Sequence, residues 1–198
     1  MPDRAQDPPP SRAQAADGTA AMVSGPYVEK GWAYRLEDVP SGLVEVIKAA
    51  VGDVGNREEP KGSNDGPKLL KYRIGSNPKT GKHYPWCCYA LSYWYAHRDG
   101  GCPWGTLASA YKIHEWAVEH DRMLGASPVV RPGDVGIDLR KVEHPDGRRI
   151  VGHVGLIVHV LADGRLCSVE GNAGDAVRAR VKAPSEWRYL MRPTGVCE

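Results

Sequence analysis

The sequence predicts an α+β fold, in which N-terminal helices pack on a C-terminal antiparallel sheet. Apolar residues recur at helical spacing in the first two thirds of the chain, whereas the last third consists of short apolar or alternating runs separated by turn residues. The chain has 198 residues, of which 41% are hydrophobic, and this is enough for one domain with its own core.

The first 30 residues differ from the rest of the chain. Residues 1–26 are rich in Pro, Ala, Asp and Gln, and they lack the apolar run of a secretory signal. This composition is typical of disordered segments, so we expect a disordered leader over residues 1–30 and a single folded domain over residues 31–198. The sequence contains no run of 18 apolar residues, so we expect no membrane insertion.

Four helices are expected before residue 121. In the first, apolar residues recur at helical spacing behind Pro40-Ser41. The third begins at Trp86 and carries Cys87 and Cys88 in its first turn. Loops rich in Gly, Pro and Asn separate the helices. The expected ranges are 43–54, 68–72, 86–97 and 106–120.

An antiparallel sheet is expected after residue 128. The run from Val151 to Leu161 is almost continuously apolar, which is typical of a strand at the centre of a covered sheet. Near the C-terminus, Val177, Ala179 and Val181 alternate with basic residues, which predicts a strand with one wet, basic face. The other expected elements are a short strand that ends at residue 139, a hairpin tip at 144–147, and strands over 166–170 and 187–191.

Composition also limits the partners and cofactors. The formal net charge is only +2, from 26 basic and 24 acidic residues, so we expect no nucleic-acid partner. The five cysteines are an odd number without a C-x-x-C pair, so we expect neither a disulfide framework nor a structural metal. These cysteines are Cys87, Cys88, Cys102, Cys167 and Cys197.

A thiol and an imidazole occupy positions that favour joint chemistry. Cys87 lies at a helix N-terminus, where the backbone field favours the thiolate. His153, at the start of the central strand, can accept the thiol proton and return it to a leaving amine. Glu170 and Asn172 are candidates to orient the imidazole. A cysteine in an apolar helix is more often a core residue, so it is the combination that favours a hydrolytic site.

The hairpin between the two central strands tests this idea. If Asp163-Gly164 is a two-residue turn, Ala162 pairs with Arg165, and Gly155 lies opposite Asn172. His153, Glu170 and Asn172 then project from one face of the sheet, and the oxygen of either Glu170 or Asn172 can accept from the imidazole. A three-residue loop would place them on opposite faces and break the argument.

Four motifs, in this order, resemble the CHAP domain (cysteine, histidine-dependent amidohydrolase/peptidase), a branch of the papain-like NlpC/P60 group. The resemblance covers about residues 42–192 and extends to Glu59, residues 62–67 and residues 101–104 as upstream elements. It implies a papain-like fold. The four motifs are Tyr84-Pro85-Trp86-Cys87, Arg131-Pro132-Gly133-Asp134, Gly152-His153-Val154-Gly155 and Val169-Glu170-Gly171-Asn172.

The resemblance also implies the roles of the site residues. The nucleophile of the family directly follows the tryptophan, which selects Cys87 over Cys88. His153 corresponds to the base, and Glu170 and Asn172 correspond to the orienting residues. Some members carry a calcium loop of clustered Asp residues, but the chain offers only Asn64 and Asp65 there, so we expect no calcium and no other cofactor.

The implied activity is cleavage of an amide bond in peptidoglycan, by an N-acetylmuramoyl-L-alanine amidase or a stem or bridge endopeptidase. We expect a monomer with an open groove, walled by residues 62–67, 101–104 and 140–150. Asn64, Trp86 and Trp104 are candidate substrate-binding residues, although core packing explains the two tryptophans equally well.

The implied biological role is host lysis by a phage endolysin. Without an export signal, such an enzyme stays in the host bacterial cytoplasm until a holin releases it to the cell wall. A bacterial wall-hydrolase effector delivered by a secretion machine fits the same sequence. Two further alternatives are an inactive virion-structural or wall-binding protein with this fold, and a papain-like enzyme that acts on a small amide or thioester.

Overall fold

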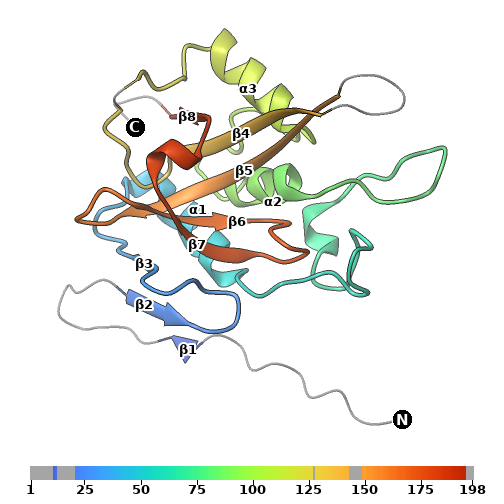
Figure 1. The fold of residues 1–198 in the computed structure, drawn as a ribbon, viewed down its shortest axis with the longest axis horizontal. Helices are drawn as coiled ribbons and strands as arrows, with labels where there is room; N and C mark the ends of the chain where they lie inside the picture. The colour runs from blue at the N-terminus through green and yellow to red at the C-terminus, as the bar shows by residue number, and fades with distance from the viewer. Residues whose placement is uncertain (1–10, 13–20, 127, 143–148, 195–198) are drawn as a thin grey trace.

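A five-stranded antiparallel sheet forms the centre of the fold (Figure 1). The structure is a computed structural model, and it describes residues 11–12, 21–126, 128–142 and 149–194. The order of the strands in the sheet is β7-β6-β5-β4-β8. Their bounds are β4 (Val135–Val142), β5 (Arg149–Val160), β6 (Leu166–Glu170), β7 (Arg178–Lys182) and β8 (Tyr189–Met191).

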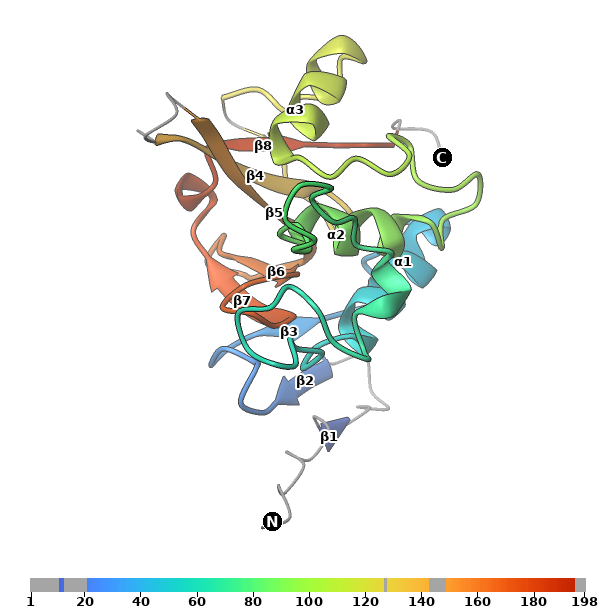
Figure 2. The ribbon, with the colours of Figure 1, turned by 90° about the vertical axis from the view of Figure 1, so that its right-hand side faces the viewer.

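Within the described residues, three α-helices precede this sheet along the chain: α1 (Val44–Gly52), α2 (Cys87–Tyr95) and α3 (Ala110–Glu119). Figure 2 shows α1 and α2 on one side of the sheet, while α3 packs against β4 and β5. α2 contacts both α1 and β5 and is buried on almost every side, as expected for a helix that is apolar all round. The α+β fold predicted from the sequence, with a papain-like arrangement, is confirmed.

Short single-turn helices accompany the main elements. They are η1 (Ser41–Leu43), η2 (Leu70–Tyr72) and η3 (Pro184–Glu186). The second replaces the helix predicted over 68–72. α3 begins four residues later than predicted, because the backbone at Ser109, directly before it, is extended.

The hairpin between β5 and β6 differs from the predicted one. Leu161 N–H donates to Arg165 O at 2.8 Å, which leaves a three-residue loop that ends at Gly164 with φ +83°. The predicted two-residue turn is therefore wrong. A β-bulge between Ile157 and His159 shifts the register by one more residue, so that Leu156 lies opposite Val169. The two shifts add up to two residues, which is the side-chain period of a strand, so His153 and Glu170 still project from the same face of the sheet.

Strand β7 also departs from the prediction. Val177 and Ala179 are buried and Arg180 is exposed, as the alternation predicts. The Lys182 side chain does not extend into solvent as predicted, because it turns inward and pairs with Glu170. Ionic pairing with a buried carboxylate explains why a lysine is withdrawn from water here.

The N-terminal segment contains a second, small sheet. Its strands are β1 (Ser11–Arg12), β2 (Ala21–Ser24) and β3 (Ala33–Tyr34). Part of the stretch expected to be a disordered leader thus has strand structure. Ala179 N–H donates to Tyr27 O, and Glu29 N–H donates to Ala179 O, each at 2.9 Å, so residues 27–29 cover the edge strand β7.

Several sequence predictions concern residues outside the described ranges: the leader at residues 1–10 and 13–20, the hairpin tip at 144–147 with that part of the expected groove wall, and Cys197. In the part that is described, no helix is long and apolar enough to cross a membrane.

Candidate active site

Cys87 is the first residue of α2, and its position depends on Trp86 directly before it. The Trp86 side chain is fully buried, stacks on Tyr72 with 5.5 Å between ring centroids, and donates its indole N–H to Glu58 Oε1 at 2.9 Å. These contacts fix the start of the helix. The N–H groups of its first turn have no acceptor within the helix, so they favour a negative charge at this end.

His153 reaches the same point from β5. Its Nε2 is 2.8 Å from Glu170 Oε2, and because an ionised carboxylate only accepts, Nε2 carries the proton of this hydrogen bond. The other ring nitrogen, Nδ1, is then free for the hydrogen bond between His153 and Cys87. The structure therefore brings Cys87, His153 and Glu170 together in the order thiol, imidazole, carboxylate.

The pKa shifts follow from these contacts. The hydrogen bond from Cys88, and then the hydrogen bond and charge of His153, hold the pKa of Cys87 well below its usual range despite burial. Burial opposes the charged form of His153, but hydrogen bonds to Cys87 and Glu170 outweigh it and raise the pKa of His153 to about 9. The site thus favours a thiolate–imidazolium pair.

Glu170 completes the array as a buried anion. Burial alone would raise the pKa of Glu170, but the hydrogen bond and charge of His153, followed by the charge of Lys182, lower it to about 2. Ser168 Oγ donates to Glu170 Oε1 at 2.8 Å. A Cβ atom at Gly155 would lie 2.9 Å from Glu170 Cγ, so only glycine fits beside this carboxylate.

The two adjacent thiols are not equivalent. Cys87 is 7% exposed and Cys88 1% exposed, and their Sγ atoms are 3.9 Å apart. The hydrogen bond to Cys87 and burial together raise the pKa of Cys88. Cys88 is therefore placed as a buried S–H donor to the Cys87 thiolate.

Asn172 lies near the site but has different partners from those predicted. With its amide oxygen toward α2, it accepts from Trp86 N–H at 3.1 Å and donates to Glu58 Oε1 at 3.3 Å. It also contacts the side chain of Asn64 at 3.2 Å. Because Asn172 has φ +56°, its side chain leaves the alternation of β6 and is directed to the helix start, so Glu170 is the residue that orients His153.

Sequence reasoning missed Glu58. Its buried carboxylate accepts from Trp86 Nε1 on Oε1 and from Asn64 N–H on Oε2, at 2.9 and 3.0 Å. The resemblance described from the sequence pointed instead to the neighbouring Glu59, whose side chain is 54% exposed. An acidic residue before the Gly-Ser-Asn loop was the available signal, and it could not distinguish two adjacent glutamates.

The two candidate stacking tryptophans are both in the core. Trp86 is fully buried, and Trp104 donates its indole N–H to Ser92 Oγ at 2.9 Å and packs on Tyr95 and Trp116. Both tryptophans therefore pack in the core, as the alternative interpretation predicted, and neither offers an exposed ring on which a substrate could stack. Asn64 remains half-buried beside Asn172.

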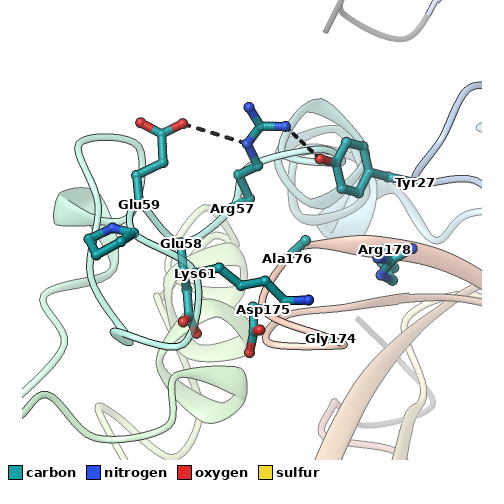
Figure 3. A pocket seen from close by; sticks show the side chains of 10 residues that line it. Tyr27, Arg57, Glu58, Glu59, Lys61, Gly174, Asp175, Ala176 and Arg178 are labelled. Atoms are coloured by element: carbon teal, nitrogen blue, oxygen red, sulfur yellow. Dashed lines mark hydrogen bonds and ion pairs between the residues drawn. The ribbon is translucent and has the colours of Figure 1, made fainter. Parts of the chain in front are cut away.

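A cavity of about 680 Å³ lies next to this region (Figure 3). Its wall includes Arg57, which is 2.9 Å from Tyr27 OH and 3.6 Å from Glu59 Oε1. It is bounded by residues 57–61 and by the loop that follows Asn172, and it has charged groups of both signs. Cys87, His153 and Glu170 do not line it, so its size does not make it the reaction centre.

Among the residues that the structure describes, no group of three or more His, Cys, Asp or Glu side chains is placed to hold a metal ion.

Comparison with known proteins gives one match. Residues 79–172 match the model of the CHAP domain family, a range that includes Cys87, His153, Glu170 and Asn172. Neither the curated proteins nor the solved structures contain a significant match.

Proposed function

We propose that the chain hydrolyses a peptidoglycan amide bond with Cys87 as the nucleophile, because residues 79–172 match the CHAP domain, which indicates an amidase or peptidase that acts on peptidoglycan. The observation that carries this proposal is the hydrogen-bonded series of Cys87, His153 and Glu170. Such a complete series also favours an active enzyme over a binding protein that retained only the fold.

The first half of the reaction forms an acyl-enzyme. The Cys87 thiolate attacks the carbonyl carbon, a C–S bond forms, and the oxyanion lies near the N–H groups at the start of α2. His153 donates its Nδ1 proton to the amide nitrogen, the C–N bond breaks, and the amine leaves. Glu170 keeps the imidazole in the required orientation throughout.

The second half restores the enzyme. Neutral His153 accepts a proton from water at Nδ1, and the hydroxide attacks the thioester carbonyl. The C–S bond breaks, the acid product leaves, and the Cys87 thiolate and the His153 imidazolium are restored. The step needs no group beyond water and these side chains.

The substrate within this class is also part of the proposal. We assign cleavage to the muramoyl–alanine bond or to a stem or bridge peptide bond, in a monomeric enzyme that serves host lysis. Peptidoglycan hydrolysis supports a role in host lysis, because lysis requires cleavage of the wall polymer.

Digestion of purified peptidoglycan followed by mass analysis tests the proposal. New lactyl carboxyl ends on muramic acid, with a free amine on the released alanine, identify an amidase; new peptide amines without new lactyl carboxyl ends identify an endopeptidase. The control is His153→Ala, which lacks the proton donor and is expected to release no fragments. If wild type releases none from walls of several peptide chemistries, or if His153→Ala releases them equally fast, the proposal is wrong.

The pH dependence of hydrolysis is expected to show an alkaline limb near pH 9. The rate needs the protonated form of His153, and the pKa of His153 is about 9, so kcat/KM is retained below this pH and falls as the pH rises through it. A pH profile of kcat/KM on a soluble wall fragment measures this limb. A limb near the ordinary histidine pKa of about 6.5 would contradict the stabilised imidazolium.

A further inference from the structure

We propose that Lys182 is a positioning residue of this site, which holds Glu170 as an ionised, correctly oriented partner of His153. The hydrolysis assay that tests this inference rests on the proposed function, whereas the contacts of Lys182 do not depend on it. Lys182 acts on the reaction through Glu170, so it is a positioning residue and not a catalytic one.

The carboxylate of Glu170 is held by both oxygens. Lys182 Nζ is 2.9 Å from Oε1 and 3.0 Å from Oε2. Ser168 Oγ also donates to Oε1, and His153 Nε2 donates to Oε2, each at 2.8 Å. With donors on both sides, the carboxylate cannot rotate without losing a contact, and Oε2 stays directed at the imidazole.

Lys182 is itself held in place, unlike a lysine in a surface ion pair. Its side chain is 17% exposed, and Nζ lies 3.9 Å from the centroid of the buried Trp187 ring. The Trp187 ring is almost parallel to that of His153, at 7° and with centroids 6.5 Å apart. Lys182 is therefore fixed between Trp187 and Glu170 by a cation–π contact and an ion pair.

The charges of the site explain why a lysine is useful here. The Glu170 side chain is 1% exposed, so its negative charge needs a partner in every protonation state of the reaction. His153 is positive in the thiolate–imidazolium pair but neutral while it accepts a proton from water. Lys182 remains positive in both states and keeps Glu170 ionised when the imidazole is neutral.

Other charged groups near the site do not replace Lys182. Asp138 of β4 lies opposite His153 and pairs with Arg140 at 3.0 Å. Arg178 of β7 lies opposite Glu170 but donates to Ala173 O at 2.7 Å. From α2, only the negative Cys87 faces the imidazole.

The test compares Lys182→Met with Arg180→Met. Arg180 is on the same strand and the same face, and it is exposed and makes no contact with Glu170 within the described structure. In Lys182→Met the pKa of Glu170 rises, so Glu170 takes up a proton at mildly acidic pH and no longer accepts from His153. We expect the acid limb of kcat/KM to move toward neutral pH and kcat to fall about 10–100-fold with little change in KM, as for other residues that orient a catalytic group.

A second measurement does not depend on the substrate. The rate of Cys87 alkylation by iodoacetamide, followed by peptide mass spectrometry across pH, reports the thiolate. Its acid limb should move upward in Lys182→Met, stay unchanged in Arg180→Met, and return to the wild-type position in Lys182→Arg. If Lys182→Met does not fold, Lys182→Gln, which keeps a donor without the charge, gives the same comparison.

The outcomes separate the two proposals. Unchanged acid limbs in both Lys182→Met and Lys182→Gln overturn the positioning role, whatever the substrate proves to be. A limb that moves equally in Arg180→Met also overturns it, because the effect is then one of general surface charge. A shift of the alkylation limb without any wall hydrolysis by wild type supports Lys182 and refutes the proposed substrate.

Discussion

Cys87→Ala is expected to abolish peptidoglycan hydrolysis, whereas Cys88→Ala should retain most of it. Only Cys87 shares a hydrogen bond with His153, and only its pKa is lowered, while the pKa of Cys88 is raised. Loss of a nucleophile that acts together with its base lowers kcat by about 10⁴-fold or more. Loss of the Cys88 thiol removes one weak donor 3.9 Å from Cys87 Sγ and should lower the rate by about tenfold or less.

Release of soluble fragments from purified walls measures both variants. Thermal unfolding is the control, because both side chains are buried and a shared loss of folding would imitate a catalytic effect. An active Cys87→Ala together with an inactive, folded Cys88→Ala would show that the nucleophile is the second thiol. The same result would contradict the role of His153, because Cys88 is not among the groups that shift the pKa of His153.

The architecture could be predicted from the sequence because periodicity reports which side of an element is buried. β6 was predicted with its observed bounds, and α2 was predicted to within a residue at its start. The hairpin register could not be predicted in the same way. The Ala-Asp-Gly-Arg run is compatible with loops of two or three residues, and the bulge near Val158 leaves no trace in a continuously apolar strand.

The site was predictable only where the residues directly react or contact a reacting group. Cys87 is the first residue of α2 and Glu170 the last residue of β6, and local sequence reveals such element ends; His153 lies within β5. Glu58 and Lys182 act across 28 and 12 residues of chain, and their side chains belong to a polar loop and to an alternating basic strand. Only the tertiary packing shows that Glu58 and not Glu59 is buried, and that Lys182 and not Arg180 turns inward.

Glu58→Ala is expected to destabilise the fold by about 2–4 kcal/mol, because it leaves the buried Trp86 indole N–H and the Asn64 N–H without their acceptor. Both donors lie next to the start of α2, so the position of Cys87 should be disturbed as well. The control is Glu59→Ala, which removes only an exposed pair with Arg57 at 3.6 Å and should cost about 0.5 kcal/mol or less. Chemical denaturation of the two variants measures the difference.

Glu58→Gln separates the loss of an acceptor from the loss of volume. Trp86 and Asn172 donate to Oε1 and Asn64 donates to Oε2, whereas a glutamine has only one oxygen, so at least one donor must lose its partner. We therefore expect a destabilisation of about 1–2 kcal/mol, between those of wild type and Glu58→Ala. If Glu58→Gln were as stable as wild type, hydrogen bonding by the carboxylate would not be what holds the helix start, and packing of Trp86 on Tyr72 would be the remaining cause.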